Sequence, residues 1–503
     1  MLTVSPGNLS LEQIRISLEN DTRIQLDPDC LDGIVQAQDA VKQVIDQHQT
    51  VYGINTGFGL LANTRISDSD LSQLQLNIVR SHAAGTGKPM PPGVVRLAIL
   101  LKVNSLARGY SGVRPVVIDT LIEVYNSGAV PIVPEKGSVG ASGDLAPLAH
   151  LSCCLIGEGS MLIDGKTVPS ADALRQLGIR PVELGPKEGL ALLNGTQIST
   201  ALALCNLLLA EKVFSAAIIA GGMSVDAARG SSVPFDNRIQ TIRNHRGQID
   251  VARCFRELME GSEILESHVD CDRVQDPYSL RCQPQVMGAC LEQIRFVADV
   301  LSRESNAVSD NPLVFADTGE ILSGGNFHAE PVAMAADNLA IAIAEIGSLS
   351  ERRIALLIDT HLSELPPFLV NNSGLNSGFM LAQVTAAAVA SENKSLAHPA
   401  SVDSLPTSAN QEDHVSMATF AARRLGEMND NTATIVAIEM LAAAQGIDFR
   451  SPKKTSPRLQ KSYIIVRSAV PNYESDRLFA PDIEAIKQLV LSGAFKLDDG
   501  VFG

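Results

Sequence analysis

Hydrophobic positions in the second half of the chain recur with the period of an α-helix. Between residues 287 and 301 they are spaced three, four and seven apart, which places them on one helical face: Met287, Cys290, Leu291, Ile294, Val297 and Leu301. Two alanine-rich segments contain no proline, and two later segments repeat the helical pattern: 334–358 and 379–396, then 413–425 and 432–445. The sequence therefore predicts a series of long helices.

Strand signals are few, and the clearest one lies in the N-terminal part of the chain. Residues 161–163 and 166–168 are short β-forming runs separated by Asp164-Gly165, a dipeptide typical of a two-residue hairpin turn. Glycine and proline gather in several loops of the same region. These patterns predict a mainly α protein with a loop-rich N-terminal region that carries a short hairpin.

Composition and charge narrow the range of partners. The chain has 503 residues, of which 45% are hydrophobic and 19% are charged, as in an ordinary globular protein. Its net charge of −16 argues against nucleic acid or an anionic membrane as a partner. A small-molecule substrate remains open.

Cysteine usage and the N-terminal sequence indicate the cellular compartment. Eight cysteines in a chain of this length do not make a disulfide framework, so we expect reduced thiols. The first residues lack the basic and then apolar order of a signal peptide. The uncharged stretch 189–210 contains several polar residues that a bilayer would penalise, and a buried helix near a polar site explains it better. We therefore predict a cytoplasmic protein with no membrane partner.

A serine among glycines, in the segment GSVGASGDLAP at 137–147, is the first candidate for chemistry. The nucleophile elbow of serine hydrolases has the order G-x-S-x-G, whereas here glycine follows Ser142 directly and Asp144 occupies the position of the second glycine. Nothing specific nominates the histidine and acid that a hydrolase also needs. The spacing therefore disfavours a hydrolase.

The order Ala141-Ser142-Gly143 suits an internal cyclisation instead. If the amide nitrogen of Gly143 attacks the carbonyl carbon of Ala141, a five-membered ring closes. Loss of water, including the Ser142 hydroxyl, then leaves an imidazolone with an exocyclic methylene. Glycine offers an unhindered nitrogen and tolerates unusual dihedral angles, and alanine keeps the attacked carbonyl uncrowded. The product would be an electrophile made by the protein itself.

Signals for other cofactors are weak. Residues 57–62 fit the dinucleotide fingerprint G-x-G-x-x-G/A, but no alternation of strands and helices surrounds them, so we expect no nucleotide. None of the nine histidines forms an H-E-x-x-H pair, and His328-Ala329-Glu330 is too short for a zinc-binding helix motif. We therefore expect no metal in the chemistry, and the sequence leaves the role of His414 open.

The segment GSVGASGDLAPLAH resembles the signature of the aromatic amino acid ammonia-lyases, in which an Ala-Ser-Gly triad forms 4-methylideneimidazol-5-one autocatalytically. Seven further segments match the family pattern in order: YGINTGFG at 52–59, SHAAGTGKP at 81–89, LLNGTQ at 192–197, QDPYSLRCQPQ at 275–285, SDNPL at 309–313, GGNFHAEP at 324–331 and ANQEDHVSM at 409–417. Each segment alone is modest, but together around an intact triad they are specific. The resemblance covers most of the chain and implies a long-helix bundle with a fumarase/aspartase-like core.

The resemblance also implies a carbon–nitrogen lyase and gives roles to matched residues. Attachment of the substrate amine to the electrophile would make the amine a better leaving group, and Tyr52 would be the base that removes the β-proton. Arg281 would hold the substrate carboxylate through two parallel hydrogen bonds. Asn194 and Tyr278 would hydrogen-bond the prosthetic group or the developing charge. The remaining matched positions are Gln275 and Phe327, of which Phe327 would shape the pocket.

Two positions resemble the histidine branch of the family. Ser81-His82 is the order expected in that branch, whereas phenylalanine and tyrosine lyases typically have Phe-Leu or His-Leu. Glu412 is also typical of the histidine branch, because a carboxylate can accept the imidazole N–H but would be stranded against a phenyl ring. Met380 would supply an adaptable apolar wall. Since Glu412 is distant from the triad in sequence, we expect ring formation not to require it.

The expected reaction is therefore the non-oxidative deamination of L-histidine to trans-urocanate and ammonia, the first step of histidine degradation. A tyrosine or phenylalanine ammonia-lyase or aminomutase of the same family is the alternative. A hydrolase that uses Ser142 and a catalytically silent helical binding protein are alternatives from other classes.

The family assembles as homotetramers that share active sites between subunits, so the resemblance implies a homotetramer here. We expect an N-terminal, mostly helical domain at 1–200 that carries the triad loop. A long-helix bundle domain at 201–503 would form the oligomer core. The alanine-rich segments 334–358 and 379–396 suit close packing between chains.

Overall fold

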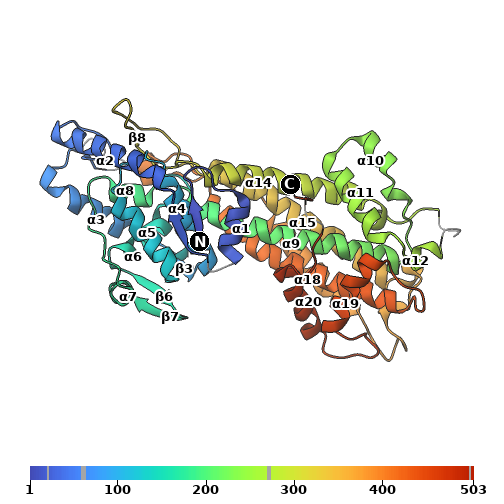
Figure 1. Cartoon of the computed structure of the whole chain (residues 1–503). Helices are drawn as coiled ribbons and strands as arrows, with labels where there is room; N and C mark the ends of the chain where they lie inside the picture. The colour runs from blue at the N-terminus through green and yellow to red at the C-terminus, as the bar shows by residue number, and fades with distance from the viewer. Residues whose placement is uncertain (20–21, 58–63, 269–273, 498–499, 503) are drawn as a thin grey trace. The chain divides into compact units, whose positions relative to one another are not determined.

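The computed structural model describes residues 1–19, 22–57, 64–268, 274–497 and 500–502, and most of them are helical (Figure 1). Two compact units can be distinguished. The first comprises Met1–Cys205, Ala298–Asp337 and Pro399–Arg423, and the second comprises Asn206–Val297, Asn338–His398 and Arg424–Gly503. The first segment ends close to residue 200, and two later segments of the chain also belong to the first unit.

The strands of the described segments lie in the first unit and form small sheets. β6 (Ser160–Ile163) and β7 (Lys166–Pro169) pair antiparallel, and Asp164 and Gly165 in the turn have φ values of 48° and 75°. This hairpin confirms the prediction from the Asp-Gly dipeptide, because such a turn requires positive φ at both central residues. The other strands are β1 (Leu2–Val4) parallel to β2 (Ile24–Leu26), β3 (Thr86–Pro89) antiparallel to β5 (Pro134–Lys136), β4 (Val130–Pro131) antiparallel to β6, and β8 (Leu313–Phe315) antiparallel to β9 (Glu320–Leu322).

Three short helices of the first unit pack against one another: α3, α6 and α8 (Figure 1). Besides its share of the long helices, this unit contains α1 (Leu11–Glu19), α2 (Leu31–Asp46), α3 (Leu71–His82), α4 (Pro92–Leu106), α5 (Pro115–Ser127), α6 (Leu145–Leu155), α7 (Ser170–Leu177) and α8 (Glu188–Leu193). α8 is fully buried, and α6 is buried over most of its length because it is apolar on nearly every side. α3 and α8 approach closely at Gly189, where a Cβ atom would lie 2.5 Å from the carbonyl oxygen of Gln75. The Gln75 side chain accepts a hydrogen bond from the Leu190 amide at 3.0 Å in the same contact.

The long helices confirm the prediction of a mainly α protein, and one of them corrects a predicted boundary. They are α9 (Gln197–Ala227), α14 (Gln283–Ser305), α15 (Glu330–Ile358) and α18 (Ala418–Asp448). The prediction of two separate helices at 413–425 and 432–445 is wrong, because α18 is continuous across 426–431. The polar Asn429 in this stretch is fully buried, and its amide donates to the carbonyl of Asn206 at 3.0 Å. Tertiary packing therefore stabilises a segment that has weak intrinsic helix propensity.

The second unit is built from helices in the part of the chain that the structure describes. Besides its share of the long helices it contains α10 (Asn237–Arg243), α11 (Arg246–Met259), α12 (Glu263–Glu266), α13 (Tyr278–Arg281), α16 (Thr360–Ser363), α17 (Met380–Leu396), α19 (Pro457–Ala469) and α20 (Ala480–Ser492). α17 coincides with the helix predicted at 379–396, within one residue at its start.

Two of the long helices are apolar and long enough to cross a membrane by length and composition alone. These helices are α9 and α15. In α9, 83% of the most apolar 18-residue stretch is buried inside the protein, and in α15 the share is 67%. Such burial is typical of core helices of a globular protein. The uncharged stretch 189–210 is buried as predicted, but it is divided between two helices, α8 and α9, rather than forming one.

Candidate active site

A cavity of about 1070 Å³ in the first unit brings together most of the predicted site residues of that unit. Those that line it are Tyr52, His82, Ala141, Ser142, Asn194, Phe327 and Glu412. Segments that are far apart in the sequence contribute these side chains. The sequence-based grouping of these residues therefore corresponds to one concave site in the structure.

The packed helices α3, α6 and α8 explain why three of these residues converge. His82 is the last residue of α3, the triad is separated from α6 by Asp144 alone, and Asn194 directly follows α8. Since the three helices pack against one another, their ends carry these residues to one place. The rigid scaffold thus positions loop residues, which is the common arrangement of functional sites.

The triad loop lies unusually close to the turn after α8. Gly143 has φ of 74°, and a Cβ atom at this position would lie 2.2 Å from the carbonyl oxygen of Gly195. The amide of Asp144 donates to that same carbonyl at 2.8 Å. Only glycine fits this combination of positive φ and close backbone approach. The third residue of the triad is therefore fixed by space as well as by chemistry.

The buried carboxylate of Asp144 holds the loop from the other side. Its Oδ1 accepts hydrogen bonds from the Ser138 hydroxyl at 3.0 Å and the Thr419 hydroxyl at 2.7 Å. Its Oδ2 accepts from the backbone amide and the hydroxyl of Ser199, at 2.7 and 2.9 Å. Burial raises the pKa of the Asp144 carboxyl, and the hydrogen bonds from Ser199, Thr419 and Ser138 oppose that rise.

The loop is also fixed before the triad, at Val139 and Gly140. The carbonyl of Gly140 accepts hydrogen bonds from the Ala329 amide at 3.2 Å and from the Ser416 hydroxyl at 2.9 Å. The Met417 amide donates to the carbonyl of Val139 at 2.8 Å. The segments 328–330 and 414–417 are thereby attached to the start of the triad loop.

Asn194 contacts the triad through its side chain and a buried lysine through its backbone. Its Nδ2 donates to the carbonyl oxygen of Ser142 at 2.9 Å. The Lys102 ammonium donates to the Asn194 carbonyl at 2.7 Å and to the Ala191 carbonyl at 3.2 Å. Burial lowers the pKa of Lys102 to about 7, although the charges of Asp310 and Asp144 oppose this shift.

Glu412 lies directly against the triad serine. Its Oε1 accepts from the Ser142 hydroxyl at 2.5 Å, and its Oε2 accepts from the hydroxyls of Thr407 and Ser408 at 2.6 and 2.9 Å. Burial pushes the pKa of Glu412 upward, but the hydrogen bonds from Ser142, Thr407 and Ser408 outweigh it, so the pKa is lowered. Glu412 is therefore a carboxylate at neutral pH.

The contact between Glu412 and Ser142 removes the reason for expecting that ring formation is independent of Glu412. The distance in sequence between Glu412 and the triad suggested that ring formation does not need the carboxylate, but folding makes the two residues neighbours. Because Glu412 accepts the hydrogen bond of the hydroxyl that cyclisation must eliminate, it is placed to influence that elimination.

His82 lines the same cavity as Glu412, and the charge of Glu412 acts on its imidazole. Burial lowers the pKa of the His82 imidazole, while the Ile78 carbonyl and the charge of Glu412 oppose the shift. The ring Nδ1 lies 3.1 Å from the Ser81 hydroxyl. The cavity wall thus holds a neutral His82 imidazole beside an ionised Glu412 carboxylate.

Comparison with known proteins identifies the family. The profile described as aromatic amino acid lyase matches residues 9–468. The chain is 63% identical to a Vibrio cholerae serotype O1 protein named histidine ammonia-lyase, over 97% of this chain and 96% of the relative. The chain belongs to the aromatic amino acid lyase family.

Solved structures of this family share the fold. A histidine ammonia-lyase from Trypanosoma cruzi superposes with a TM-score of 0.91 at 42% identity, covering 98% of this chain and 94% of the other. A tyrosine aminomutase from Streptomyces globisporus superposes with a TM-score of 0.92 at 37% identity, covering 98% of both chains. The prediction of a mainly α protein with the helical core of this family is confirmed.

Four predicted site residues of the family pattern lie in the second unit and do not line the cavity: Gln275, Tyr278, Arg281 and Met380. Tyr278 is 70% exposed, and the Arg281 guanidinium carbon lies 4.7 Å from the centre of its ring. Arg281 Nε also donates to the Asp276 carbonyl at 3.0 Å. The proposed carboxylate clamp is thus held in a defined position by its own neighbours.

Sequence reasoning gave no supporting role to Lys102 and Asp144, which support the triad from buried positions. It left the role of His414 open and placed neither His414 nor His328 in the site, and both line the cavity wall. Lys102 lies in an apolar helix, where a lysine is rare unless its charge is paired, and that contrast is the signal that could have found it. The nucleotide fingerprint at 57–62 falls on residues that, apart from Gly57, lie outside those described.

The buried lysine yields a test of the site's electrostatics. In the unfolded chain a lysine has a pKa near 10.4, so between about pH 7 and pH 10 the unfolded state binds a proton that folded Lys102 has released. The free energy of unfolding therefore rises with pH over this range, so the stabilisation that comes from the lowered pKa of Lys102 is present at high pH and is lost as the pH falls to about 7. We expect the stability of the wild type relative to Lys102→Met to be greater at about pH 9.5 than at pH 7.

Urea unfolding midpoints of both proteins at the two pH values measure this difference. Lys166→Met, which removes an exposed lysine of β7, is the matched control and should show no such pH dependence. A difference between wild type and Lys102→Met that stays constant with pH would contradict the assignment.

Proposed function

We propose that the protein deaminates L-histidine to trans-urocanate and ammonia, as a histidine ammonia-lyase that makes its own electrophile. The observation that carries this proposal is the contact between Glu412 Oε1 and the Ser142 hydroxyl at 2.5 Å. It brings a carboxylate suited to an imidazole next to the triad that resembles the family's prosthetic-group precursor. The curated relatives at 61–63% identity, all named histidine ammonia-lyase, support the same substrate.

The surroundings of the triad fit the formation of 4-methylideneimidazol-5-one from Ala141-Ser142-Gly143. Cyclisation eliminates the Ala141 carbonyl oxygen and the Ser142 hydroxyl, so the oxygen that remains on the ring is the Ser142 carbonyl. That oxygen is the one that accepts the Asn194 hydrogen bond at 2.9 Å. The backbone space at Gly143 admits no side chain. These contacts suit both the ring and its precursor.

When formed, this group supplies an electrophilic carbon for the amine of the substrate. Asn194 would withdraw electron density through the hydrogen bond to the ring oxygen and would stabilise negative charge there. Tyr52, on the same cavity wall, would accept the β-proton of the substrate. Arg281 and Tyr278 would bind the carboxylate end, and Gln275, Phe327 and Met380 would complete the substrate contacts.

Loss of the Ser142 hydroxyl explains how Glu412 changes partner. Oε2 of Glu412 stays anchored by Thr407 and Ser408, whereas Oε1 loses the hydrogen bond that it accepts from Ser142. This freed oxygen would then accept the imidazole N–H of the substrate. A phenyl ring offers no such donor, so the carboxylate would be stranded against phenylalanine. For this reason we favour histidine over phenylalanine, and the relatives named histidine ammonia-lyase favour it over tyrosine.

We further infer a cytoplasmic homotetramer with shared sites and without nucleic acid or membrane partners. The support for assembly is that the family's site residues are divided here between a cavity in the first unit and side chains of the second. The exposed apolar residues of α17, Leu381 at 61% and Val384 at 50%, suit contact with another copy. The elimination needs neither a nucleotide nor a metal in this scheme.

The prosthetic group yields the first prediction for this function. Ring formation eliminates two waters, so the intact protein is expected to weigh roughly 36 Da less than its sequence, as follows from the unhindered attack of Gly143. Ser142→Ala should fold and should have the mass of its own sequence, because no dehydrated ring forms. It should release almost no urocanate from histidine. Intact mass spectrometry and ultraviolet detection of urocanate measure both. A fully active wild type at undiminished mass would exclude this chemistry.

Glu412 yields the second prediction, because it would bind the imidazole. A charge-assisted hydrogen bond in a dry pocket contributes about 1.5–3 kcal/mol, so Glu412→Gln should lower kcat/KM for histidine about ten- to a hundredfold, and Glu412→Ala by more. Asp403→Asn, an exposed carboxylate of the same segment, is the control. Wild-type turnover by Glu412→Ala would refute the assignment.

The same variants separate substrate binding from ring formation. If Glu412 also assists loss of the Ser142 hydroxyl, part of the Glu412→Ala protein should retain its full mass, and the dehydrated part should still turn over histidine poorly. The double substitution Ser81→Phe and His82→Leu, made in a Glu412 variant, should improve the use of phenylalanine as substrate, because it removes polar groups that a phenyl ring would leave without partners.

Assembly yields the third prediction. Light scattering should give a tetramer, and dilution or mild denaturant that dissociates it should abolish activity, because one chain would not hold a complete site. An active monomer would contradict the shared-site arrangement while leaving the elimination chemistry intact.

A further inference from the structure

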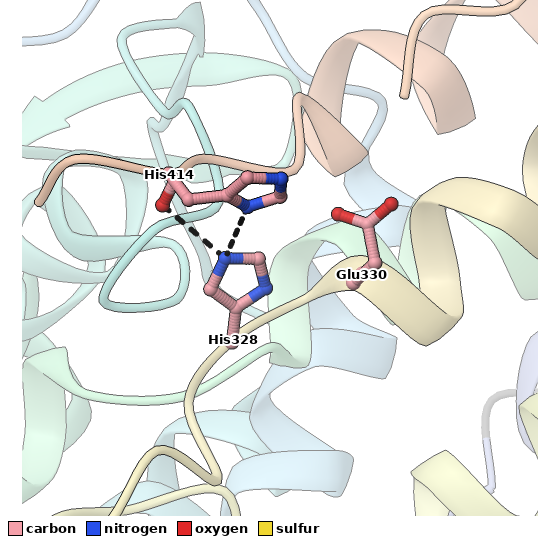
Figure 2. A group of neighbouring side chains, drawn as sticks. All are labelled: His328, Glu330 and His414. Atoms are coloured by element: carbon pink, nitrogen blue, oxygen red, sulfur yellow. Dashed lines mark hydrogen bonds between the residues drawn. The ribbon is translucent and has the colours of Figure 1, made fainter. Parts of the chain in front are cut away.

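Three side chains that the proposed elimination does not use gather at the cavity wall. His328, Glu330 and His414 offer ligand atoms that all lie within 4.8 Å of one another (Figure 2). His328 and His414 both line the cavity, and His414 is exposed. The group therefore has a path to solvent.

Long hydrogen bonds join the two histidines, and the separation of their rings also suits a shared metal ion. His328 Nε2 lies 3.4 Å from His414 Nδ1 and 3.3 Å from the His414 carbonyl oxygen, so both hydrogen bonds, dashed in Figure 2, are longer than the usual N–H hydrogen bond of about 2.7–3.2 Å. Two nitrogens 3.4 Å apart, each about 2.0–2.1 Å from a zinc ion, subtend an angle of about 110° at that ion. This is the tetrahedral angle.

The carboxylate of Glu330 supplies an independent observation. Its Oε2 is buried and has no hydrogen-bond partner among the residues that the structure describes. Figure 2 shows the carboxylate turned toward the two rings from the start of α15. A buried carboxylate oxygen without a donor is costly, and a cation beside it removes that cost.

The ligands are held in place by backbone contacts rather than by long flexible segments. Ala329, between His328 and Glu330, donates its amide to the Gly140 carbonyl at 3.2 Å. Ser416, two residues after His414, donates its hydroxyl to the same carbonyl at 2.9 Å. One carbonyl thus fixes both ligand segments, which is the preorganisation that a metal site requires.

We propose that His328, Glu330 and His414 form a binding site for a divalent transition-metal ion of the zinc type. Two neutral imidazoles and one carboxylate are a donor set that zinc and its neighbours in the first transition row accept, with a fourth position left for water. The ion is no part of the elimination, and the site is argued independently of the lyase activity.

Binding has a consequence for the neighbouring loop. The two ligand segments are attached to Gly140, which directly precedes Ala141 in the triad loop. A metal ion that joins His328 to His414 would link these segments a second time. The bound ion is therefore expected to stabilise the folded protein against heat and to reduce motion at the start of the triad loop.

Metal titration of the purified, full-length protein tests the proposal. After removal of bound metal with a chelator, Co²⁺ should bind at one ion per chain and give the intense visible absorption of a tetrahedral cobalt site, and Zn²⁺ should displace it. Zn²⁺ should also raise the melting temperature. Failure of the wild type to bind either ion at the cluster, with no absorption and no thermal shift, would overturn the proposal.

Variants assign the ion to these three residues. His328→Ala, His414→Ala and Glu330→Gln should each weaken binding at least about a hundredfold, since even partners outside the coordination sphere typically contribute about 10–100-fold. Glu330→Gln nearly preserves shape and keeps the test valid if a histidine variant is unstable. His48→Ala, an exposed histidine that pairs with Asp68, is the matched control and should bind normally.

The variants also give the contrary outcome. Equal affinity of the wild type and of all three folded variants would place the ion elsewhere and refute the site. Because binding and melting temperature are read without substrate, neither result depends on histidine turnover, so failure of this proposal and failure of the proposed function can be distinguished.

Discussion

A single buried carboxylate, Asp144, joins the segments on which the rest of the site depends. It receives hydrogen bonds from Ser138 before the triad, from Ser199 at the start of α9 and from Thr419 at the start of α18. A fully buried carboxylate is tolerated only when donors surround it, so the three segments are held at fixed distances from the triad. The close approach of Gly143 to Gly195 is maintained by this arrangement.

That constraint explains how two chemically different groups come to share one cavity. The triad is held from behind by Asp144, and the segment that carries Glu412 is attached to the same loop through Ser416 and Gly140. Glu412 is thereby positioned against Ser142 without any direct connection in sequence. Under the proposed function, a carboxylate that contacts the serine hydroxyl and then the substrate imidazole would link the making of the electrophile with the choice of substrate.

Local sequence patterns predicted the elements well, and contacts across the chain limited the rest. The hairpin at Asp164-Gly165 and the helix α17 follow from turn chemistry and alanine content, which act over a few residues. The continuity of α18 depends on a buried partner for Asn429, and the contact of Glu412 with Ser142 depends on tertiary packing. Likewise, His328-Ala329-Glu330 has no metal-binding spacing of its own, and only folding adds His414 to it. The motif resemblance located most cavity residues, but it could not supply these neighbours.

Incubation of the purified protein with L-histidine, L-tyrosine and L-phenylalanine in separate reactions is the direct test of histidine deamination. Each unsaturated acid absorbs at its own wavelength, and ammonium can be measured in the same samples. We expect trans-urocanate and ammonium in equal amounts from histidine, without any added cofactor, and little product from the other two amino acids. Coumarate or cinnamate as the main product, or no ammonium from histidine, would contradict it.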